Sequence, residues 1–588
     1  MAKLPRFPIA LPLRGIALAG LCALYLLAGL VGHDPWKNDD AIHFGVVYGF
    51  LNNQDWLVPR LAGESYLETP PLYYWVAAIC AKLLGGWLPL HDAVRLASGL
   101  FGALFLYLLA FASRILHDLE SANLRSKHDT ERGESGGAAT LVAMGCLGLL
   151  VPIHDTQPMV ALLAASAATH AGLALLLLRP LAGGMLAGIG LGLGFLASGL
   201  MILVTMLPLL LLLPINRHWR SAAGLGGIAV AAMVALLLSA SWPLWLLRSS
   251  PDMFDAWRSQ AVAGVGYQSG WLKAVPNHLE LLAWFAWPAL PLALWALWLN
   301  RKDLGQPAIA LPLGGSVVSL VCLLMIYGPR PLLALPLLVP LVLLAARSAS
   351  RLRRGATNAF DWFGMMTFSL VAAVIWIYGL ALSAGVPARL AQHLAGLAPG
   401  FVARYSPLAY VTAALLCLVW LWLIFASARS PWRAATHWAA GMTLMWVLMA
   451  ALWMPAIDHR VSYRSVAVSL KQALSGQAGY SRVEHQNQET KGGHPYPETK
   501  GGHQYPETKD GHQCIAGRNL GGAQRASLEY FADIVTLRQE SRAGRTCQLL
   551  LEQGSEHGAA PPSGWRKIWE GHRPGDKTER LRLYQRES

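Results

Sequence analysis

Long apolar runs separated by short polar loops make up most of residues 1–456. A helix of about 20 apolar residues crosses the roughly 30 Å hydrocarbon core of a bilayer. Counting the runs that reach or approach this length predicts about thirteen membrane-spanning helices. The predicted spans cover residues 8–31, 91–117, 138–153, 158–178, 180–196, 198–214, 222–247, 277–299, 307–327, 331–346, 361–384, 407–428 and 434–455.

The stretch from 138 to 214 contains the shortest runs, which are punctuated by Pro152, Pro158 and Pro180. Counts that differ by about two spans therefore remain open there. Two further segments, 39–53 and 66–86, are too polar or too interrupted to span a bilayer. We predict that both are helices lying at the membrane interface, anchored by Trp56, Tyr73, Tyr74 and Trp75.

The composition agrees with a polytopic membrane protein and excludes an ordinary soluble globule. Hydrophobic residues make up 54% of the chain, charged residues only 14%, and the mean hydropathy is +0.40. The formal net charge of +14 arises from basic residues dispersed over short loops and the C-terminal tail. No nucleic-acid-binding motif accompanies them, so we predict no nucleic-acid partner.

The basic loops also predict the orientation. They alternate to one side of the predicted spans, which the positive-inside rule assigns to the cytoplasm. The first run is long and lacks a clear cleavage site, so it reads as a signal anchor with its N-terminus inside. Residues 32–90 and the tail after 456 are then outside, in the periplasm if the membrane is a bacterial inner membrane. The basic residues are Lys3, Arg6, Arg14, Arg217, Arg220, Arg301, Lys302, Arg347, Arg351, Arg353, Arg354, Arg429 and Arg433.

Composition divides the chain into two domains. Residues 1–456 form the predicted transmembrane domain, and 457–588 form a polar domain with the pattern of a small α/β unit. Cys514 and Cys547 both fall in this tail, where an oxidising compartment leaves a disulfide and free thiols as open alternatives. A nine-residue unit repeats between 485 and 513 with regular histidines. Because every unit also carries Gly, Pro and Lys, we predict a flexible loop rather than a metal site.

Carboxylates gather at the predicted outer face of the membrane. Asp39, Asp40 and Glu68 belong to the first outer loop, and Asp155 lies in the turn "VPIHDTQPM" between two spans. Acidic groups beside lipid are costly to desolvate unless they are paired or used. Outer-facing cations are also predicted, namely Arg60, Arg258, Lys273 and Arg330.

The stretch "NDDAIHFGVVYGFLNNQDWLVPRLAGESYLETPPLYYW" at 38–75 resembles the first periplasmic loop of the aminoarabinose transferase family, relatives of the protein O-mannosyltransferases. The resemblance extends to Asp155, to "GPRPLLALPLLVP" and to the size of the tail. It implies a GT-C fold: an α-helical polytopic membrane protein with about thirteen spans, interfacial helices and a small C-terminal α/β periplasmic domain. Three departures stand out: Asp39-Asp40 replaces Asp-Glu, Thr69 replaces a Lys, and "ASG" at 197–199 lacks another Lys.

The implied reaction transfers a sugar, such as 4-amino-4-deoxy-L-arabinose, from undecaprenyl phosphate to lipid A or another acceptor. A polyprenyl-phosphate donor suits an outward-facing site, because nucleotide sugars are absent there. Asp39 is the predicted carboxylate at the reacting centre of an inverting displacement, with Asp155 and Glu68 orienting the acceptor. No cofactor is required on this interpretation, although a divalent ion bound by Glu68 is left open.

Six further residues are predicted to bind substrate. Arg60, with Arg258 or Arg330, would hold the phosphate, and Asp40, Tyr73 and Tyr74 would line the site. Each has a simpler alternative: Asp39 as a helix N-cap, Asp155 as a turn residue, Glu68 as a solvated charge, the arginines as lipid contacts and the tyrosines as anchors.

Alternative functions remain open at this stage. A protein or other glycan glycosyltransferase would use the same kind of site with a different acceptor. A lipid-linked sugar transporter or flippase would place ionisable residues near the bilayer midplane in two related halves. The spans are almost free of charge and show no duplication, which favours the transferase. We expect a monomer in contact with membrane lipids.

Overall fold

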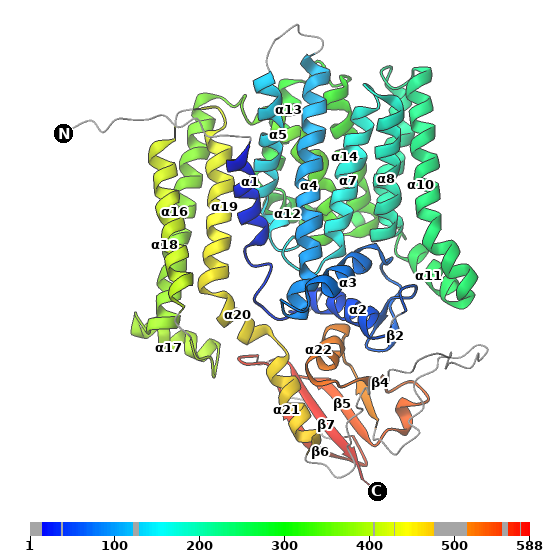
Figure 1. The fold of residues 1–588 in the computed structure, drawn as a ribbon, viewed down its shortest axis with the longest axis vertical. Coiled ribbons are helices and arrows are strands. Elements are labelled where there is room, and N and C mark those ends of the chain that lie inside the picture. The colour runs from blue at the N-terminus through cyan, green and yellow to red at the C-terminus, as the bar shows by residue number, and fades with distance from the viewer. Residues whose placement is uncertain are drawn as a thin grey trace, which may run out of the picture.

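The computed structural model describes residues 15–36, 39–53, 55–121, 129–267, 269–403, 406–427, 430–475, 514–555, 562–576 and 578–587. A bundle of long helices forms one part, and a small domain built on a sheet lies beyond one end of it (Figure 1). The predicted repeat at 485–513 lies outside the described residues, so the prediction of a flexible loop stays a prediction.

Eight helices of the described residues are long and apolar enough to cross a membrane. A ninth span results if α12 and α13, which meet at a bend of 96°, count as one. The sequence predicted a single run at 277–299, which the structure breaks at Trp287-Pro288. The eight are α4 (Leu90–Ser121), α7 (Pro158–Leu175), α8 (Pro180–Ser198), α10 (Ala222–Ser249), α14 (Pro307–Cys322, continued by η3, Leu323–Tyr327), α16 (Arg354–Ala384), α18 (Pro407–Ala426) and α19 (Arg433–Leu452); the bent pair is α12 (Val275–Phe285) and α13 (Ala289–Leu299).

Shorter apolar helices coincide with the remaining predicted spans. They are α1 (Ile16–Leu27), α5 (Asp129–Met144), α9 (Leu200–Leu212) and α15 (Leu335–Ser348). The predicted run at 138–153 is divided, because α5 ends at Met144 and the short α6 (Leu147–Leu150) follows. A multi-pass helical membrane domain is therefore present, and the count of thirteen stays a prediction.

Two of the three prolines that punctuate the middle of the sequence mark helix starts, whereas Pro152 lies in the turn after α6. Pro158 and Pro180 occupy the first turns of α7 and α8, where a missing N–H leaves no hydrogen bond unmade. Gln157 caps α7 by accepting from the Met159 amide at 3.3 Å. Small residues then bring the helices close: a Cβ on Gly184 of α8 would lie 2.3 Å from the Gly227 carbonyl oxygen of α10. These helices therefore pack through their backbones, as membrane helices commonly do.

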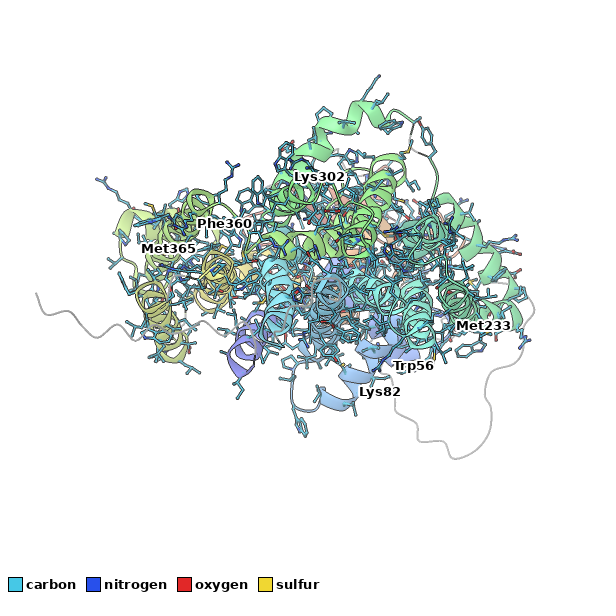
Figure 2. The ribbon with its side chains drawn as sticks, turned by 90° about the horizontal axis from the view of Figure 1, so that it is seen from above. Trp56, Lys82, Met233, Lys302, Phe360 and Met365 are labelled. Carbon is cyan, nitrogen blue, oxygen red and sulfur yellow. A yellow bond between two sulfur atoms is a disulfide. The ribbon has the colours of Figure 1, made fainter. Side chains whose placement is uncertain are left out.

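The first extramembrane loop folds at one end of the bundle. It contains α2 (Asp39–Asn53), a hairpin of β1 (Arg60–Leu61) and β2 (Glu64–Ser65), and α3 (Leu72–Leu84). The helix predicted at 39–53 has the observed bounds, whereas the second predicted helix begins at Leu72, immediately after Pro70-Pro71. Lys82 of α3 lies over the Trp56 ring at 4.6 Å, and Figure 2 shows the pair at the margin of the bundle.

The tail folds as the predicted α/β domain. Five strands form a mixed sheet in the order β4-β3-β5-β7-β6, with β3 parallel to β4 and β5 and the remaining pairs antiparallel. Cys514 and Cys547 form a disulfide, which decides the alternative left open by the sequence. The elements are α21 (Arg464–Ser475), β3 (Ile515–Arg518), α22 (Gly522–Ala532), β4 (Thr536–Arg538), β5 (Leu549–Gly554), β6 (Trp565–Gly571) and β7 (Arg580–Arg586), joined to α19 by α20 (Met454–Val461).

The small domain docks on the first loop, with α22 directly against α2 (Figure 1). Gly45 permits the close approach, since a Cβ there would lie 2.5 Å from the Ala526 Cβ. Glu64 receives charged hydrogen bonds at 2.8 Å from Arg525 and from Arg538. The acid in the hairpin is therefore a docking residue, and the loop that carries the candidate site is held from both sides.

Candidate functional site

Asp39 and Asp40 begin α2 side by side, but their side chains have different surroundings. Successive helix residues point about 100° apart, because 3.6 residues complete a turn. Asp39 is half-buried, whereas Asp40 is only 4% exposed. The two neighbouring carboxylates therefore belong to separate clusters.

Asp40 forms part of a buried ion pair that fixes the start of α2. Its Oδ2 lies 3.3 Å from Arg95 Nη2 and accepts from the Trp36 amide at 3.0 Å, while Oδ1 accepts from the Thr156 amide at 2.8 Å. Burial alone would raise the pKa of Asp40, but the Arg95 charge and these hydrogen bonds outweigh it and hold the pKa below its ordinary value. Asp40 is therefore an ionised carboxylate with both oxygens occupied.

Arg95, on α4, is fully buried and joins the loop to the membrane domain. Its Nη1 donates to the Asp92 carboxylate at 3.1 Å and to the Leu30 and His33 carbonyls at 3.2 and 3.3 Å. Asp92 in turn accepts from the Gly32 amide at 3.0 Å with each oxygen. The guanidinium thus holds the turn at 30–34 and the start of α2 in one arrangement. We call Asp40, Asp92 and Arg95 the framework cluster.

Asp39, Glu68 and Asp155 form a second group, the open acids, near the same helix start. Burial and then the charge of Glu68 raise the pKa of Asp39. Burial also raises the pKa of Asp155, and the charges of Asp40 and Asp39 add to this effect more than Arg95 opposes it. The three acids predicted from distant parts of the sequence are therefore brought together. Within the described residues, none of them forms a salt bridge with a cation.

The turn that carries Asp155 is clamped in position. Ser98 Oγ donates to the Asp155 carbonyl at 2.5 Å, and the Gln157 amide donates to the Tyr73 hydroxyl at 3.1 Å. With the bond from the Thr156 amide to Asp40, three successive residues are tied to α2, α3 and α4. These bonds fix the turn, which holds the Asp155 carboxylate beside Asp39. An ordinary turn residue would not require links to three helices.

Three residues predicted to bind substrate are buried and hydrogen-bonded within the protein, so their contact with substrate stays a prediction. Tyr73 and Tyr74 are both 0% exposed, with the Tyr73 hydroxyl 2.7 Å from Ser98 Oγ and the Tyr74 hydroxyl 2.8 Å from His43 Nδ1. Asp40 is 4% exposed, and its oxygens accept from the Trp36 and Thr156 amides and pair with Arg95. All three side chains hold the loop through these hydrogen bonds.

The predicted phosphate-binding cations lie on three different elements. Arg60 is on β1 with Nε 3.9 Å from Asp55, and Arg258 is on α11 (Pro251–Ala263) with Nη2 3.0 Å from Asp255. Arg330 is exposed between η3 and η4 (Leu332–Ala334). Each is accessible to solvent or lipid, and no contact recorded among the described residues joins any of them to the open acids.

The sequence did not single out Arg95, the residue on which the framework depends. A signal was present, since an ionisable residue just inside an apolar run is expected to have a buried partner. The Asp34 link to the tail was missed as well: Asp34 forms a bidentate pair with Arg464, and the Asp34 amide donates to Asp458 at 2.9 Å. Such long-range pairs leave no pattern in a single sequence.

A protein-held metal site is not supported by this arrangement. Among the described residues, no group of three or more His, Cys, Asp or Glu side chains is placed to hold a metal ion. Glu68 is exposed, and its Oε2 accepts from the Tyr66 hydroxyl at 3.3 Å.

No protein-family model matches the chain. It is 29% identical over 457 residues to the undecaprenyl phosphate-α-4-amino-4-deoxy-L-arabinose arabinosyl transferase of Pseudomonas aeruginosa PAO1, covering 75% of this chain and 76% of that protein. The enzyme of the same name from Pseudomonas paraeruginosa is 29% identical over 73% of each chain. The crystal structure of ArnT from Cupriavidus metallidurans bound to undecaprenyl phosphate superimposes with a TM-score of 0.64 at 14% identity, covering 96% of this chain and 97% of that one. The chain is therefore similar in sequence to the aminoarabinose transferases and shares the GT-C fold of ArnT.

Two departures of this aminoarabinose transferase-like protein lie beside the first loop. Thr69, where the family has a Lys, is 9% exposed. The segment 197–199, which lacks the second Lys, contacts the loop as well: a Cβ on Gly199 would lie 3.7 Å from the Pro70 ring. Both positions therefore lie in or against the first loop, and neither carries the cation that the resemblance implies.

Proposed function

We propose that the protein is an integral-membrane glycosyltransferase that uses an undecaprenyl-phosphate-linked sugar. The sugar is 4-amino-4-deoxy-L-arabinose, as in the names of the relatives, and the acceptor is lipid A or a similar molecule. The homology over three quarters of the chain and the match of the fold over nearly its whole length support this proposal. The observation that carries it is the group of open acids at one end of the membrane domain.

The reaction breaks the bond between the anomeric carbon and the donor phosphate oxygen, and forms a bond from an acceptor oxygen to that carbon. Undecaprenyl phosphate leaves with the electron pair of the broken bond. Positive charge develops on the sugar ring in such a transition state. A carboxylate fixed beside the ring stabilises this charge, and it also accepts the proton if the acceptor is a hydroxyl. Asp39 is the residue proposed for this role, in a single inverting displacement.

Glu68 and Asp155 suit the recognition of a cationic sugar. An amino sugar carries an ammonium group at neutral pH, and a carboxylate is its ordinary partner. Because the open acids have no cation of their own among the described residues, binding such a sugar compensates charges that otherwise repel one another. Acceptor orientation by the same two acids remains part of the proposal.

The donor phosphate requires cations as well. Arg60, Arg258 and Arg330 are the proposed candidates, because all three lie on extramembrane segments and Arg presents a bidentate donor pair to phosphate. A divalent ion held by Glu68 together with donor phosphate oxygens is an alternative that a chelator experiment tests. We further propose that the site faces the periplasm from a bacterial inner membrane and that the protein acts as a monomer without nucleic acid.

The direct test uses purified full-length protein with undecaprenyl-phosphate aminoarabinose and lipid A. Mass spectrometry is expected to show acceptor modified by one pentosamine unit and release of undecaprenyl phosphate. The Asp39→Asn variant is expected to lose about 10²- to 10⁴-fold in rate, the range of a positioned acid or base. Inversion at the anomeric carbon is read by NMR of the product.

A matched control is Asp533→Asn, which removes an exposed acid of the docked domain at a position whose φ of 58° suits Asn. This variant is expected to keep full transfer. Full transfer by Asp39→Asn would contradict the catalytic assignment. Movement of intact donor across vesicles without cleavage would instead identify a flippase, and modification of a protein rather than lipid A would keep the chemistry and change the acceptor.

A further inference from the structure

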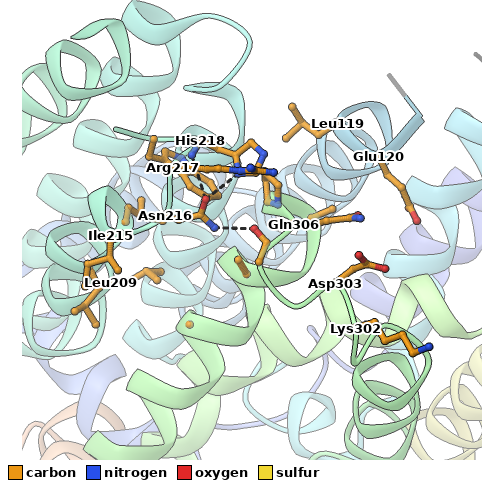
Figure 3. Close-up of a pocket in the computed structure, with 18 residues that line it drawn as sticks. Leu119, Glu120, Leu209, Ile215, Asn216, Arg217, His218, Lys302, Asp303 and Gln306 are labelled. Atoms are coloured by element: carbon orange, nitrogen blue, oxygen red, sulfur yellow. Dashed lines mark hydrogen bonds between the residues drawn. The ribbon is translucent and has the colours of Figure 1, made fainter. Parts of the chain in front are cut away.

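A second site of different character lies at the opposite end of the membrane domain from the open acids. A hollow of about 860 Å³ opens where the end of α9, the following loop at 215–219 and the loop before α14 meet the end of α4. Figure 3 shows Arg217 and His218 on one side of it, and Lys302, Asp303 and Glu120 on the other. Nothing in the proposed reaction uses this end of the molecule.

The rim of the hollow is held by defined contacts. Asn216 Nδ2 donates to the Gly305 carbonyl at 2.8 Å, which joins the two loops across the hollow. His218 donates to Asn216 Oδ1 from its amide at 3.1 Å, with its Nδ1 2.8 Å from the same oxygen. Trp219 is fully buried, and its Nε1 donates to the Leu173 carbonyl at 3.1 Å. The loop that carries Arg217 is therefore anchored on both sides of that residue.

The charge of the hollow favours an anion. Arg217 and Lys302 are exposed, and within the part of the chain that the structure describes neither forms an ion pair. Glu120 is already compensated by Arg347 at 2.8 Å and by Arg351 at 3.6 Å. Asp303 is the remaining acid of the lining. Because Glu120 is compensated by these two arginines outside the lining, Arg217 and Lys302 face a single uncompensated acid, and one positive charge is left to pair with a ligand.

The floor of the hollow is apolar and continues onto the surface of the membrane domain. Leu209, Leu212 and Leu213 line it from α9 and the turn that follows. Leu211 and Leu212 are 67% and 51% exposed and Ile215 is 75% exposed. Exposed leucines at the end of a helix in a membrane domain meet acyl chains rather than water. A ligand with an anionic head and a hydrocarbon chain therefore matches both parts of the hollow.

We propose that this hollow binds one anionic phospholipid of the leaflet opposite the open acids. Its phosphodiester lies between Arg217 and Lys302, with the planar guanidinium of Arg217 as the directional donor. One acyl chain follows Leu209 and Leu212 along α9. No covalent step takes place, and the site is independent of the transfer reaction proposed above. A zwitterionic lipid fits less well, because its ammonium group would bring a further positive charge beside Arg217 and Lys302.

The test is native mass spectrometry of the full-length protein in detergent, titrated with phosphatidylglycerol and with phosphatidylethanolamine of identical acyl chains. The expected result is preferential retention of phosphatidylglycerol. The Arg217→Gln/Lys302→Gln variant is expected to bind it more weakly by about 25-fold, since each of the two cations near an anionic headgroup contributes roughly fivefold, or about 1 kcal/mol.

A matched control exists in the same two loops. Arg220 and Arg301 do not line the hollow, and Arg301 instead lies over the Trp298 ring at 4.7 Å. The Arg220→Gln/Arg301→Gln variant loses the same charge and is expected to bind phosphatidylglycerol as the unaltered protein does. Equal weakening by both double variants, or equal retention of the two lipids by the unaltered protein, would overturn the proposal.

A second variant keeps every charge. Leu212→Trp fills the apolar floor, and it is expected to lower phosphatidylglycerol binding by several-fold at an unchanged unfolding temperature. Unchanged lipid binding by this variant contradicts an acyl chain along α9. The transfer assay of each variant in detergent reports separately on the proposed function, which this site does not determine.

Discussion

The framework cluster and the open acids lie at the same end of the protein, and both contain carboxylates. They differ in whether a cation and backbone amides compensate those carboxylates. In the framework, Arg95 compensates Asp40 and Asp92, and backbone amides occupy their oxygens. Among the open acids, burial raises the pKa values of Asp39 and Asp155, and repulsion from neighbouring carboxylates adds to the rise. A paired buried acid stabilises a fold, whereas acids held together without a cation store unfavourable energy. This contrast is the reason for proposing Asp39, rather than Asp40, as the residue that carries the chemistry.

The largest expected effect comes from removing the centre of the framework. Arg95→Ala leaves Asp40 and Asp92 buried without their cation, which costs about 3–5 kcal/mol. It also frees the carbonyls of the turn at 30–34. We expect most of the variant to be lost during membrane insertion or to elute as aggregate in size-exclusion chromatography. Arg95→Lys, which keeps the charge but not the fork of donors, is expected to recover part of the folded protein. Normal yield and unfolding temperature for Arg95→Ala would remove the basis for separating the two clusters.

Replacing each of the two neighbouring acids by its amide tests the difference between the framework cluster and the open acids. Asp40→Asn removes the negative charge beside a buried guanidinium and is expected to lower the free energy of unfolding by about 2–3 kcal/mol. Asp39→Asn removes a charge that is repelled by Glu68, so its unfolding temperature is expected to be unchanged or higher. Thermal unfolding of the two variants in the same detergent measures the difference. The assignment is reversed if Asp39→Asn unfolds earlier than Asp40→Asn.

The sequence predicts the helices and the gathering of the acids, but not which of the acids are buried and paired. Runs of apolar residues and the positions of prolines predict the membrane helices. The bounds of α2 follow from the sequence as well, because 39–53 is apolar on one helical face and too polar to span a bilayer. The gathering of Asp39, Glu68 and Asp155 followed from one inference, that loops on the same side of a membrane meet. Arg95 was not recognised because it lies inside a run interpreted only by its hydropathy. Which of two adjacent acids is buried depends on helix rotation relative to α4, and a single sequence contains no record of that packing.

The link between the framework and the docked domain is expected to contribute less. Arg464 pairs with Asp34, whose backbone carbonyl Arg95 holds, but the Arg464 side chain is 54% exposed and partly screened. Arg464→Ala is expected to lower the free energy of unfolding by about 1–2 kcal/mol. A double-mutant cycle with Asp34→Asn isolates the pair. Arg538→Ala is the control, since Glu64 keeps its bond to Arg525.

The same pair has a pH dependence whose sign is fixed. Burial would raise the pKa of Asp34, but the Arg464 and Ser462 hydrogen bonds lower it overall. A carboxyl with a lowered pKa in the folded state stabilises the protein above its unfolded pKa of about 3.9 and loses that contribution as the pH falls through the folded value. The difference between Arg464→Ala and the unaltered protein is therefore expected to shrink below about pH 4. A difference that grows on acidification would contradict an ionised Asp34.

The smallest effect concerns the pH profile of the reaction. If Asp39 acts as a carboxylate, activity falls on the acidic side as Asp39 becomes protonated, and its raised pKa moves that limb toward neutral pH. Glu68→Gln removes the negative charge that contributes to this rise, so the acidic limb of kcat/KM is expected to shift to lower pH. Asp533→Asn, which removes an equal charge outside the group, is expected to leave the limb in place. An acidic limb that is unchanged in Glu68→Gln, or that moves to higher pH, would mean that Asp39 does not titrate beside Glu68 during catalysis. The open acids would then differ from the framework cluster only in their exposure.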